Sequence, residues 1–148
     1  MAIVLEGNRG RVYVSPSPIQ ESIATEIARA PMPEIALPGN TRDFKTPLYG
    51  INTFSELFTS RQLLALSTLS ELVGESRALI RRHAVEAGAA DDDLALNDGG
   101  NGSRAYSEAV SVYLGALVDQ QSNQLSTVCG WNNINQQMIV TFSRQALP

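Results

Sequence analysis

The alternation of apolar and polar residues at the start of the chain predicts a small β-hairpin. Residues 3–5 and 11–14 are short runs rich in apolar and β-branched side chains, and residues 7–10 between them read Gly-Asn-Arg-Gly. Such runs on either side of a turn that contains glycine and asparagine are typical of two paired strands. We therefore expect a hairpin within residues 1–16.

A short helix is predicted after the hairpin. Residues 17–20 read Ser-Pro-Ile-Gln, which places a serine at the N-cap, a proline at the first helical position and a glutamine at the third. Isoleucines at positions 19, 23 and 27 fall on one helical face, so the helix should extend to about Ala30. Residues 31–50 contain several prolines and have neither a helical nor a strand period, which predicts an extended connector within the segment 17–52.

The longest helical pattern lies in the segment 53–88. Residues 53–56 and 59–62 are both capping boxes, so one short turn should break before a second helix begins. That helix should reach Gly88, a length of about 40 Å at about 1.5 Å per residue. Its weak point is Gly74, which costs about 1 kcal/mol relative to alanine. The apolar face consists of Leu63, Leu66, Leu69, Val73, Ile80 and Ala84.

A polar loop and a third helix are predicted next. Residues 89–102 include three consecutive aspartates and a run of glycines and asparagines, a composition that predicts a flexible loop. Ser103 is a suitable N-cap for a helix that should end near Gly130. A last amphipathic piece, from about Asn133 to Phe142, completes a predicted C-terminal helical segment, 103–148. The face of the third helix consists of Tyr106, Val110, Tyr113, Leu117, Gln121, Leu125 and Val128.

These patterns predict one mainly α-helical domain of 148 residues, with a small N-terminal β-hairpin and long connecting loops. The helices that start at Thr59 and Ser103 carry matching apolar stripes, so we expect them to pack antiparallel across the loop between them. The faces that contain Leu66 and Val110 should then point into the same core.

The composition is that of an ordinary globular protein, with 43% hydrophobic and 18% charged residues. No apolar run approaches the roughly 20 residues that span a bilayer, and the first residues lack the features of a signal peptide, so we expect a cytoplasmic protein with no membrane partner. The net charge of −4 has the wrong sign for a free-standing module that binds phosphates electrostatically. Any contact with DNA should therefore be local.

Few residues are candidates for chemistry. Cys129 is the single cysteine and His83 the single histidine, which excludes a disulfide and a four-ligand zinc site within the chain. His83 suits the carbonyl end of a helix and Cys129 a packed apolar position, because the sequence assigns no base or orienting carboxylate to either. Residues 97–108 fit the frame of a calcium-binding loop poorly, since its first and third positions are asparagine and glycine. Residues 99–103 lack the lysine of a phosphate-binding loop.

One long block of the sequence resembles a known family. Residues 47–63 read Pro-Leu-Tyr-Gly-Ile-Asn-Thr-Phe-Ser-Glu-Leu-Phe-Thr-Ser-Arg-Gln-Leu, which is similar to a segment of the prokaryotic adenine-specific DNA methylases that carry a zinc-ribbon insert. Further blocks occur in the family's order and extend the resemblance over nearly the whole chain. They are Gly10-Arg11-Val12-Tyr13, the stretch from Asn123 through Cys129 to Trp131 on the third predicted helix, and Thr141 to Pro148.

The resemblance implies that the chain is the middle segment of a larger enzyme. In that family a glycine-rich motif that binds S-adenosylmethionine and the zinc-ribbon cysteines come earlier, and an Asp-Pro-Pro-Tyr motif that holds the flipped adenine comes later. None of these motifs occurs in this sequence. We therefore expect no catalytic, cofactor-binding or metal-binding residue here, while the parent chain would be a DNA adenine N6-methyltransferase that uses S-adenosylmethionine.

Two functions are compatible with the sequence. The first is an intervening scaffold or target-recognition segment that is not catalytic alone, with the remaining domains of the parent as partners and DNA bound through the parent. The second is a non-enzymatic helical protein-interaction module. In the first, Arg144 and Gln145 are candidate DNA contacts, because arginine offers a bidentate donor fork and glutamine a paired donor and acceptor. Alternatively, Arg144 pairs with a carboxylate and Gln145 caps the end of the last helix.

Overall fold

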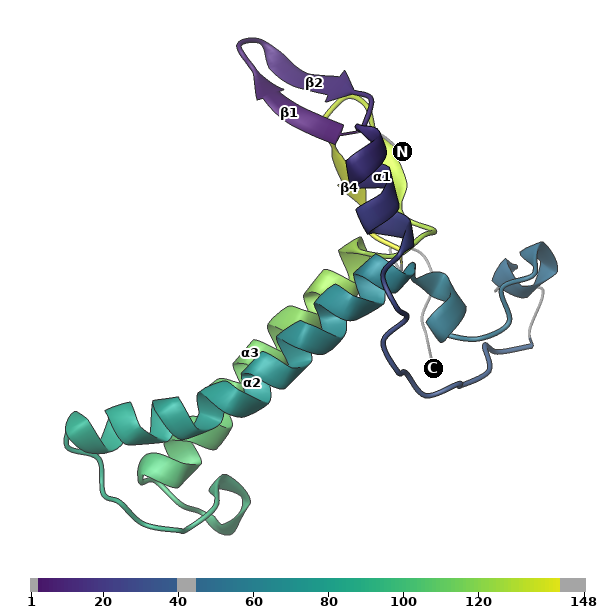
Figure 1. The fold of residues 1–148 in the computed structure, drawn as a ribbon. Coiled ribbons are helices and arrows are strands. Elements are labelled where there is room, and N and C mark those ends of the chain that lie inside the picture. Colours follow the sequence, from purple (N-terminus) through teal and green to yellow (C-terminus); the bar gives the residue numbers. More distant parts are fainter. Residues whose placement is uncertain (1–2, 40–44, 142–148) are drawn as a thin grey trace. The chain divides into compact units, whose positions relative to one another are not determined.

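A computed structural model describes residues 3–39 and 45–141 of the chain (Figure 1). The fold is mainly α-helical with a small antiparallel hairpin at its start, as the sequence predicts. The chain divides into two compact units, of which the first contains residues 1–63 and 126–148 and the second residues 64–125. None of the described helices combines the length and the apolar character that a membrane span requires.

The first unit begins with the predicted hairpin. Its strands, β1 (Ile3–Gly7) and β2 (Gly10–Val14), pair antiparallel with Ile3 opposite Val14. Gly10 has a φ of 135°, a conformation that residues with a Cβ rarely adopt, which explains why glycine follows the turn. Every residue of β2 is exposed, so this ribbon presents its side chains at the surface.

The helix α1 (Pro18–Thr25) begins as predicted and ends early. The backbone N–H of Ser17 donates to Oε1 of Gln20 at 2.8 Å, which forms the expected capping box. The predicted extension to about Ala30 is wrong. The isoleucine face of the helix is largely exposed and provides little burial to prolong it, and the residue before Pro31 is disfavoured in a helical conformation.

Residues 31–39 of the connector contain no helix, as predicted, and are anchored at one point, whereas residues 46–49 depart from the prediction. Ala36 and Thr53 form an antiparallel bridge, and the backbone N–H of Leu37 donates to the carbonyl of Asn52 at 2.8 Å. A short 3-10 helix, Thr46–Tyr49, precedes the second half of this bridge. The buried apolar side chains of the unit, in its described part, are Leu37, Leu57, Phe58 and Leu63.

Of the two predicted capping boxes in the middle of the chain, the one at residues 59–62 is complete and the one at residues 53–56 is half formed. The Glu56 carboxylate accepts two backbone N–H hydrogen bonds, at 2.5 and 3.0 Å, beside the 3-10 helix Ser55–Leu57. The backbone N–H of Thr59 donates to Oε1 of Gln62 at 2.8 Å, directly before α2 (Ser60–Glu86). The chain therefore makes one turn, breaks and starts the long helix, as the two boxes indicate.

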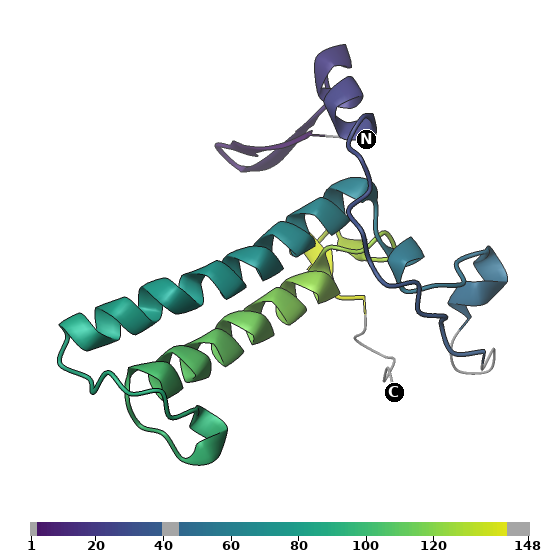
Figure 2. The same cartoon turned by 60° about the horizontal axis from the view of Figure 1, so that its bottom comes forward.

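The second unit is an antiparallel pair of helices, α2 and α3 (Ser103–Gln124) (Figure 2). Ile80 of α2 and Val110 of α3 line one hollow together, so the two predicted stripes approach each other there, although Tyr113 and Leu117 of the α3 stripe are 75% and 61% exposed. The buried side chains in the described residues of this unit are small ones, namely Ser103, Ala105, Ser107 and Ala84. Both helices also line an apolar groove, formed by Leu69, Leu72, Val73, Leu114, Leu117 and Val118.

The two ends of α3 differ from the prediction. Gly102, and not Ser103, occupies the N-cap position, so the helix begins one residue earlier than expected. The helix ends at Gln124 and does not reach Gly130. Just after this end the Ser126 hydroxyl accepts the backbone N–H two residues further on, at 3.3 Å. Such a local side-chain bond competes with the helical hydrogen bond and favours a turn.

The prediction of a helical piece from residue 133 to 142 is wrong. The described residues here form a second antiparallel hairpin, with β3 (Gly130–Asn132) and β4 (Gln137–Ile139). The side-chain carbonyl of Asn132 accepts the backbone N–H groups two and three residues further on, at 2.9 and 3.1 Å. Gln136 completes the turn with a φ of 49°. Asparagine side chains can form hydrogen bonds with the nearby backbone in this way. These local hydrogen bonds favour a turn, although the apolar residues of the stretch have a helical spacing.

Candidate functional site

The two β-hairpins of the first unit contact each other through aromatic and arginine side chains. The rings of Tyr13 in β2 and Trp131 in β3 meet edge to face, with their centroids 6.1 Å apart and their planes at 88°. The guanidinium carbon of Arg11 lies 5.7 Å from the centroid of the Trp131 ring. An aromatic pair of this kind is worth about 0.5–1.5 kcal/mol beyond its buried area, and a cation over an exposed ring about 0.5–1 kcal/mol. Side chains therefore join hairpins that are more than a hundred residues apart.

A hydrogen bond and a close approach complete the contact. The backbone N–H of Arg11 donates to Oε1 of Gln136 at 3.2 Å. A Cβ at Gly10 would lie 3.3 Å from Nε2 of Gln136, so the Gln136 amide packs closely against this position. The positive φ of residue 10 also favours glycine. Tyr13 and Trp131 are 50% and 37% exposed. The contact therefore forms a surface with two accessible rings.

A second link in the same unit joins the 3-10 helix before α2 to the segment after α3. The carbonyl oxygen of Leu57 accepts the backbone N–H of Thr127 at 2.7 Å and its hydroxyl at 2.9 Å. Leu57 is only 1% exposed, and a buried carbonyl without a partner would be costly. The neighbouring carbonyl of Ser55 accepts the guanidinium of Arg29 at 2.6 Å. Long-range polar contacts therefore hold this turn at its first and last residues.

A small polar cluster lies beside this link. Oγ of Ser126 is 2.6 Å from Oγ1 of Thr141 and 3.5 Å from Sγ of Cys129, and Sγ is 3.0 Å from the same Oγ1. Burial raises the pKa of the Cys129 thiol, but hydrogen bonds with the Thr141 and Ser126 hydroxyls outweigh it, and the pKa lies below its ordinary value. Hydroxyls of serine and threonine do not act as a base toward a thiol. The cluster therefore ties the turn after α3 to Thr141, which follows β4.

Charged residues gather at the loop end of the second unit, around Glu108 on α3. Its carboxylate binds the Arg77 guanidinium of α2, Nε of Arg104 at 3.1 Å and the backbone N–H of Leu96 at 2.7 Å. The Leu96 N–H and then the Arg104 side chain lower the pKa of Glu108. Glu108 is also the twelfth residue of the calcium-loop frame, and two arginines surround the carboxylate that such an ion would need.

The aspartates of the loop 89–102 also make contacts. Arg81 of α2 pairs with Asp91 and Asp93, each at 3.0 Å. The Asp92 carboxylate lies against the N-cap of α3, because a Cβ at Gly102 would be 2.5 Å from both of its oxygens. Among the described residues, Oδ1 of Asp92 has no hydrogen-bond partner there, and the backbone N–H of Ser103 donates to the carbonyl of Ala90. The flexibility of this loop stays a prediction.

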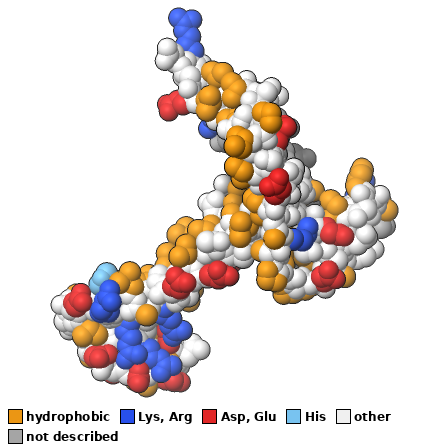
Figure 3. All heavy atoms as spheres, viewed as in Figure 1, with side chains coloured by type: hydrophobic (Ala, Val, Ile, Leu, Met, Phe, Trp, Pro, Cys, Tyr) orange, Lys and Arg blue, Asp and Glu red, His pale blue; other side chains and the backbone are white. Residues whose placement is uncertain are grey.

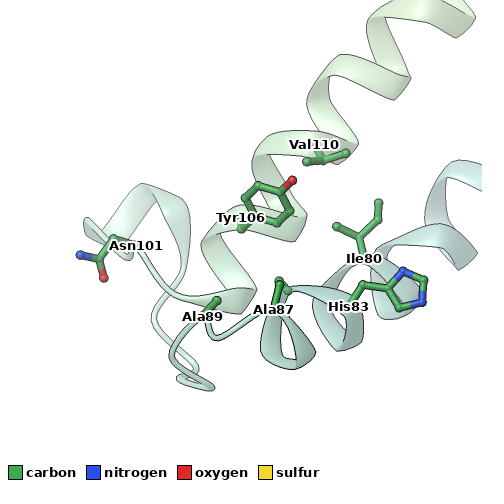
Figure 4. Close-up of a pocket in the computed structure, with 8 residues that line it drawn as sticks. Ile80, His83, Ala87, Ala89, Asn101, Tyr106 and Val110 are labelled. Atoms are coloured by element: carbon green, nitrogen blue, oxygen red, sulfur yellow. The ribbon is translucent and has the colours of Figure 1, made fainter.

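A hollow of about 520 Å³ opens between α2 and α3 near the same loop (Figure 4). Its lining combines small apolar residues with the phenol of Tyr106 and the imidazole of His83. Figure 4 shows the His83 ring turned away from Tyr106. Among the described residues no carboxylate lines this hollow, and no group of three or more His, Cys, Asp or Glu is placed to hold a metal. The hollow therefore combines one imidazole and one phenol with an apolar lining.

The structure brings together some of the sequence features noted above and leaves others undescribed. Arg144 and Gln145, the candidate DNA contacts, lie outside the described residues. Cys129 and Trp131 do not lie on the third helix, which corrects the prediction, because the helix ends before them and Trp131 belongs to β3. No pattern in the sequence predicted the contact between the hairpins. The signal that could have shown it is the single tryptophan beside a run of asparagine and glutamine, a composition typical of a turn and not of a helix.

Comparisons with known proteins add no further assignment. Neither the models of known protein families, nor the curated proteins, nor the solved structures contain a match to this chain.

Proposed function

We propose that the chain is the intervening segment of an S-adenosylmethionine-dependent, adenine-specific DNA methyltransferase, where it serves as a scaffold or target-recognition segment and is not catalytic alone. The observation that carries this proposal is the contact between separate sequence blocks. Residues 10–13 contact Trp131, and Leu57 of the block 47–63 contacts Thr127. Blocks that each resemble one family thus form parts of one structural unit, which supports treating them as one resemblance.

The chemistry of the chain agrees with a role without catalysis. Methyl transfer to adenine N6 needs a cradle for the cofactor and a pocket that stacks and hydrogen-bonds the extruded base. The glycine-rich turn before α3 does not fit S-adenosylmethionine, because Gly100 packs directly against the backbone of Leu94 and Gly102 against the Asp92 carboxylate. The other domains of the parent chain would therefore supply both the cofactor site and the adenine pocket.

The apolar groove between α2 and α3 favours a second candidate, a non-enzymatic helical protein-interaction module. Leu72 and Leu117 are 50% and 61% exposed and line the same groove of about 280 Å³. Exposed apolar grooves often mark contacts between proteins. In the methylase proposal the same groove would pack against a neighbouring domain of the parent.

The test compares the parent protein with the isolated segment. The purified parent should transfer a labelled methyl group from S-adenosylmethionine to adenine N6 in DNA, measured by nucleoside mass spectrometry. The isolated chain should transfer none and should give no measurable heat with the cofactor in calorimetry. Micromolar binding by the isolated chain would show that it contains the cofactor site. A reading frame with no Asp-Pro-Pro-Tyr motif after this segment would favour the interaction module.

A further inference from the structure

We infer that the two contacting hairpins of the first unit, residues 3–14 and 130–139, bind duplex DNA with Arg9 and Arg11 on its phosphates. We call these residues the hairpin pair. The inference deepens the proposed function and rests on it for the choice of DNA as the ligand. It concerns residues different from Arg144 and Gln145.

The acidic residues are distributed unevenly along the chain, and the hairpin pair contains only one of them, Glu6. Of the fifteen acidic residues only Glu6 lies in residues 1–20 or 120–148, although the whole chain carries −4. The first hairpin contains Arg9 and Arg11 against Glu6 and the second contains no charged residue, so the hairpin pair carries +1, two minus one. The charge that opposes phosphate binding therefore belongs to the rest of the chain.

The arginines of the hairpin pair differ from those of the second unit in their partners. Within the residues that the structure describes, no ion pair with a carboxylate involves Arg9 or Arg11. A guanidinium that no carboxylate neutralises can offer its donor fork to a phosphate. Carboxylates do pair with four arginines of the second unit, which are Arg77, Arg81, Arg82 and Arg104.

The contact between the hairpins positions Arg11 before any ligand arrives. Its backbone is tied to Gln136 and its guanidinium lies over Trp131. A side chain that is already held by a ring loses less conformational freedom on binding than a free one. Arg9 lies in the turn between β1 and β2, and Figure 3 shows a basic side chain at the tip of this hairpin. The two cations thus follow one another along a single ribbon.

The shape of the first hairpin suits a DNA groove. A two-stranded β-ribbon fits the major groove of B-DNA, which is about 12 Å wide. The exposed amide side chains of Asn133 and Gln137, in the second hairpin, carry the paired donor and acceptor that recognise adenine at its major-groove edge. The hairpin pair therefore combines phosphate contacts on one ribbon with groups for base edges on the other.

The test uses the purified chain and a short DNA duplex at low salt. Trp131 is the only tryptophan of the chain, so its fluorescence reports directly on the hairpin pair. Duplex binding should change the Trp131 emission, and Arg9→Ala/Arg11→Ala should reduce the slope of log K against log salt by about 2, at about 0.9 for each phosphate contact. The matched control is Arg82→Ala, which removes an exposed arginine of α2 and should leave both readouts unchanged.

Three results would overturn the inference: no duplex binding at low salt, binding that leaves the Trp131 emission unchanged, or a double variant with the slope of the native chain. Urea unfolding of the double variant, followed by Trp131 fluorescence, checks that the first unit is folded. The methyl-transfer assay on the parent separates this inference from the proposed function. If the double variant of the parent methylates DNA with an unchanged KM for DNA, the proposed function is retained and the inference is lost. If the parent is inactive but DNA binding still depends on the two arginines, the inference is retained and the proposed function is lost.

Discussion

The substitution Leu57→Ala tests how the first unit is stabilised. Leu57 is 1% exposed, and its carbonyl bonds to Thr127 involve only its backbone, so alanine removes buried side-chain atoms and leaves those hydrogen bonds in place. Replacing a buried leucine by alanine costs about 2–5 kcal/mol, depending on how far the cavity collapses. The unit has few buried apolar side chains around this position, so its core can partly collapse, and we expect a loss of about 2–3 kcal/mol.

Urea unfolding followed by two signals measures this loss where it occurs. Trp131 fluorescence reports the first unit, whereas circular dichroism is dominated by α2 and α3. The midpoint of the fluorescence transition should shift to lower urea in Leu57→Ala, with an unchanged slope m. Leu72→Ala is the control, because Leu72 is 50% exposed and its truncation removes far less buried surface. An unshifted fluorescence midpoint, or an equal cost in the control, would refute the argument.

Three further predictions concern other parts of the chain. Gly74→Ala should raise the stability of α2 by about 1 kcal/mol in thermal melting, because the glycine lies inside the helix and a Cβ there meets no atom within 4 Å. The lowered pKa of Glu108 means that its contribution to stability is present above its ordinary value of 4.5 and is lost as pH falls through the folded pKa. Glu108→Gln should therefore flatten the acid side of the stability profile and speed hydrogen exchange at the Leu96 amide; an unaltered profile contradicts this. In the full parent, Arg144→Ala should lower the salt dependence of DNA binding by about one phosphate contact with nearly unchanged melting, whereas lost stability with unaltered affinity would assign Arg144 to the scaffold.

Those elements that the sequence predicts well have local causes. The capping boxes at Thr59 and Ser17 depend on side chains three residues apart, and both form as expected. The pairing of α2 with α3 follows from two long apolar stripes, each of which needs a partner. The first hairpin needs only its turn and short strands. In each case the information lies within a few residues or in one repeated spacing, so a pattern along the chain is sufficient.

The features that the sequence did not predict depend on competition or on distant partners. The apolar residues near Ile134 and Met138 have a helical spacing, but the Asn132 side chain satisfies the local backbone and turns the chain back. The stacking of Arg11 on Trp131 joins residues that no local pattern relates. The candidate site is built from such contacts, and for that reason the sequence indicated its parts without indicating that they meet.

The bonds between Leu57 and Thr127 also have a consequence for the order of folding. They span 70 residues, and closing a flexible loop becomes costlier by about 0.6 kcal/mol with each doubling of its length. Once α2 and α3 have paired, they form one rigid helical hairpin that brings the two ends of the intervening chain together. The flexible loop that must still close then has roughly ten residues, which lowers the entropic cost of closure by about 2 kcal/mol. Local helix pairing is also the faster event. The helical hairpin should therefore fold first and act as an internal template, and the first unit should close only after it.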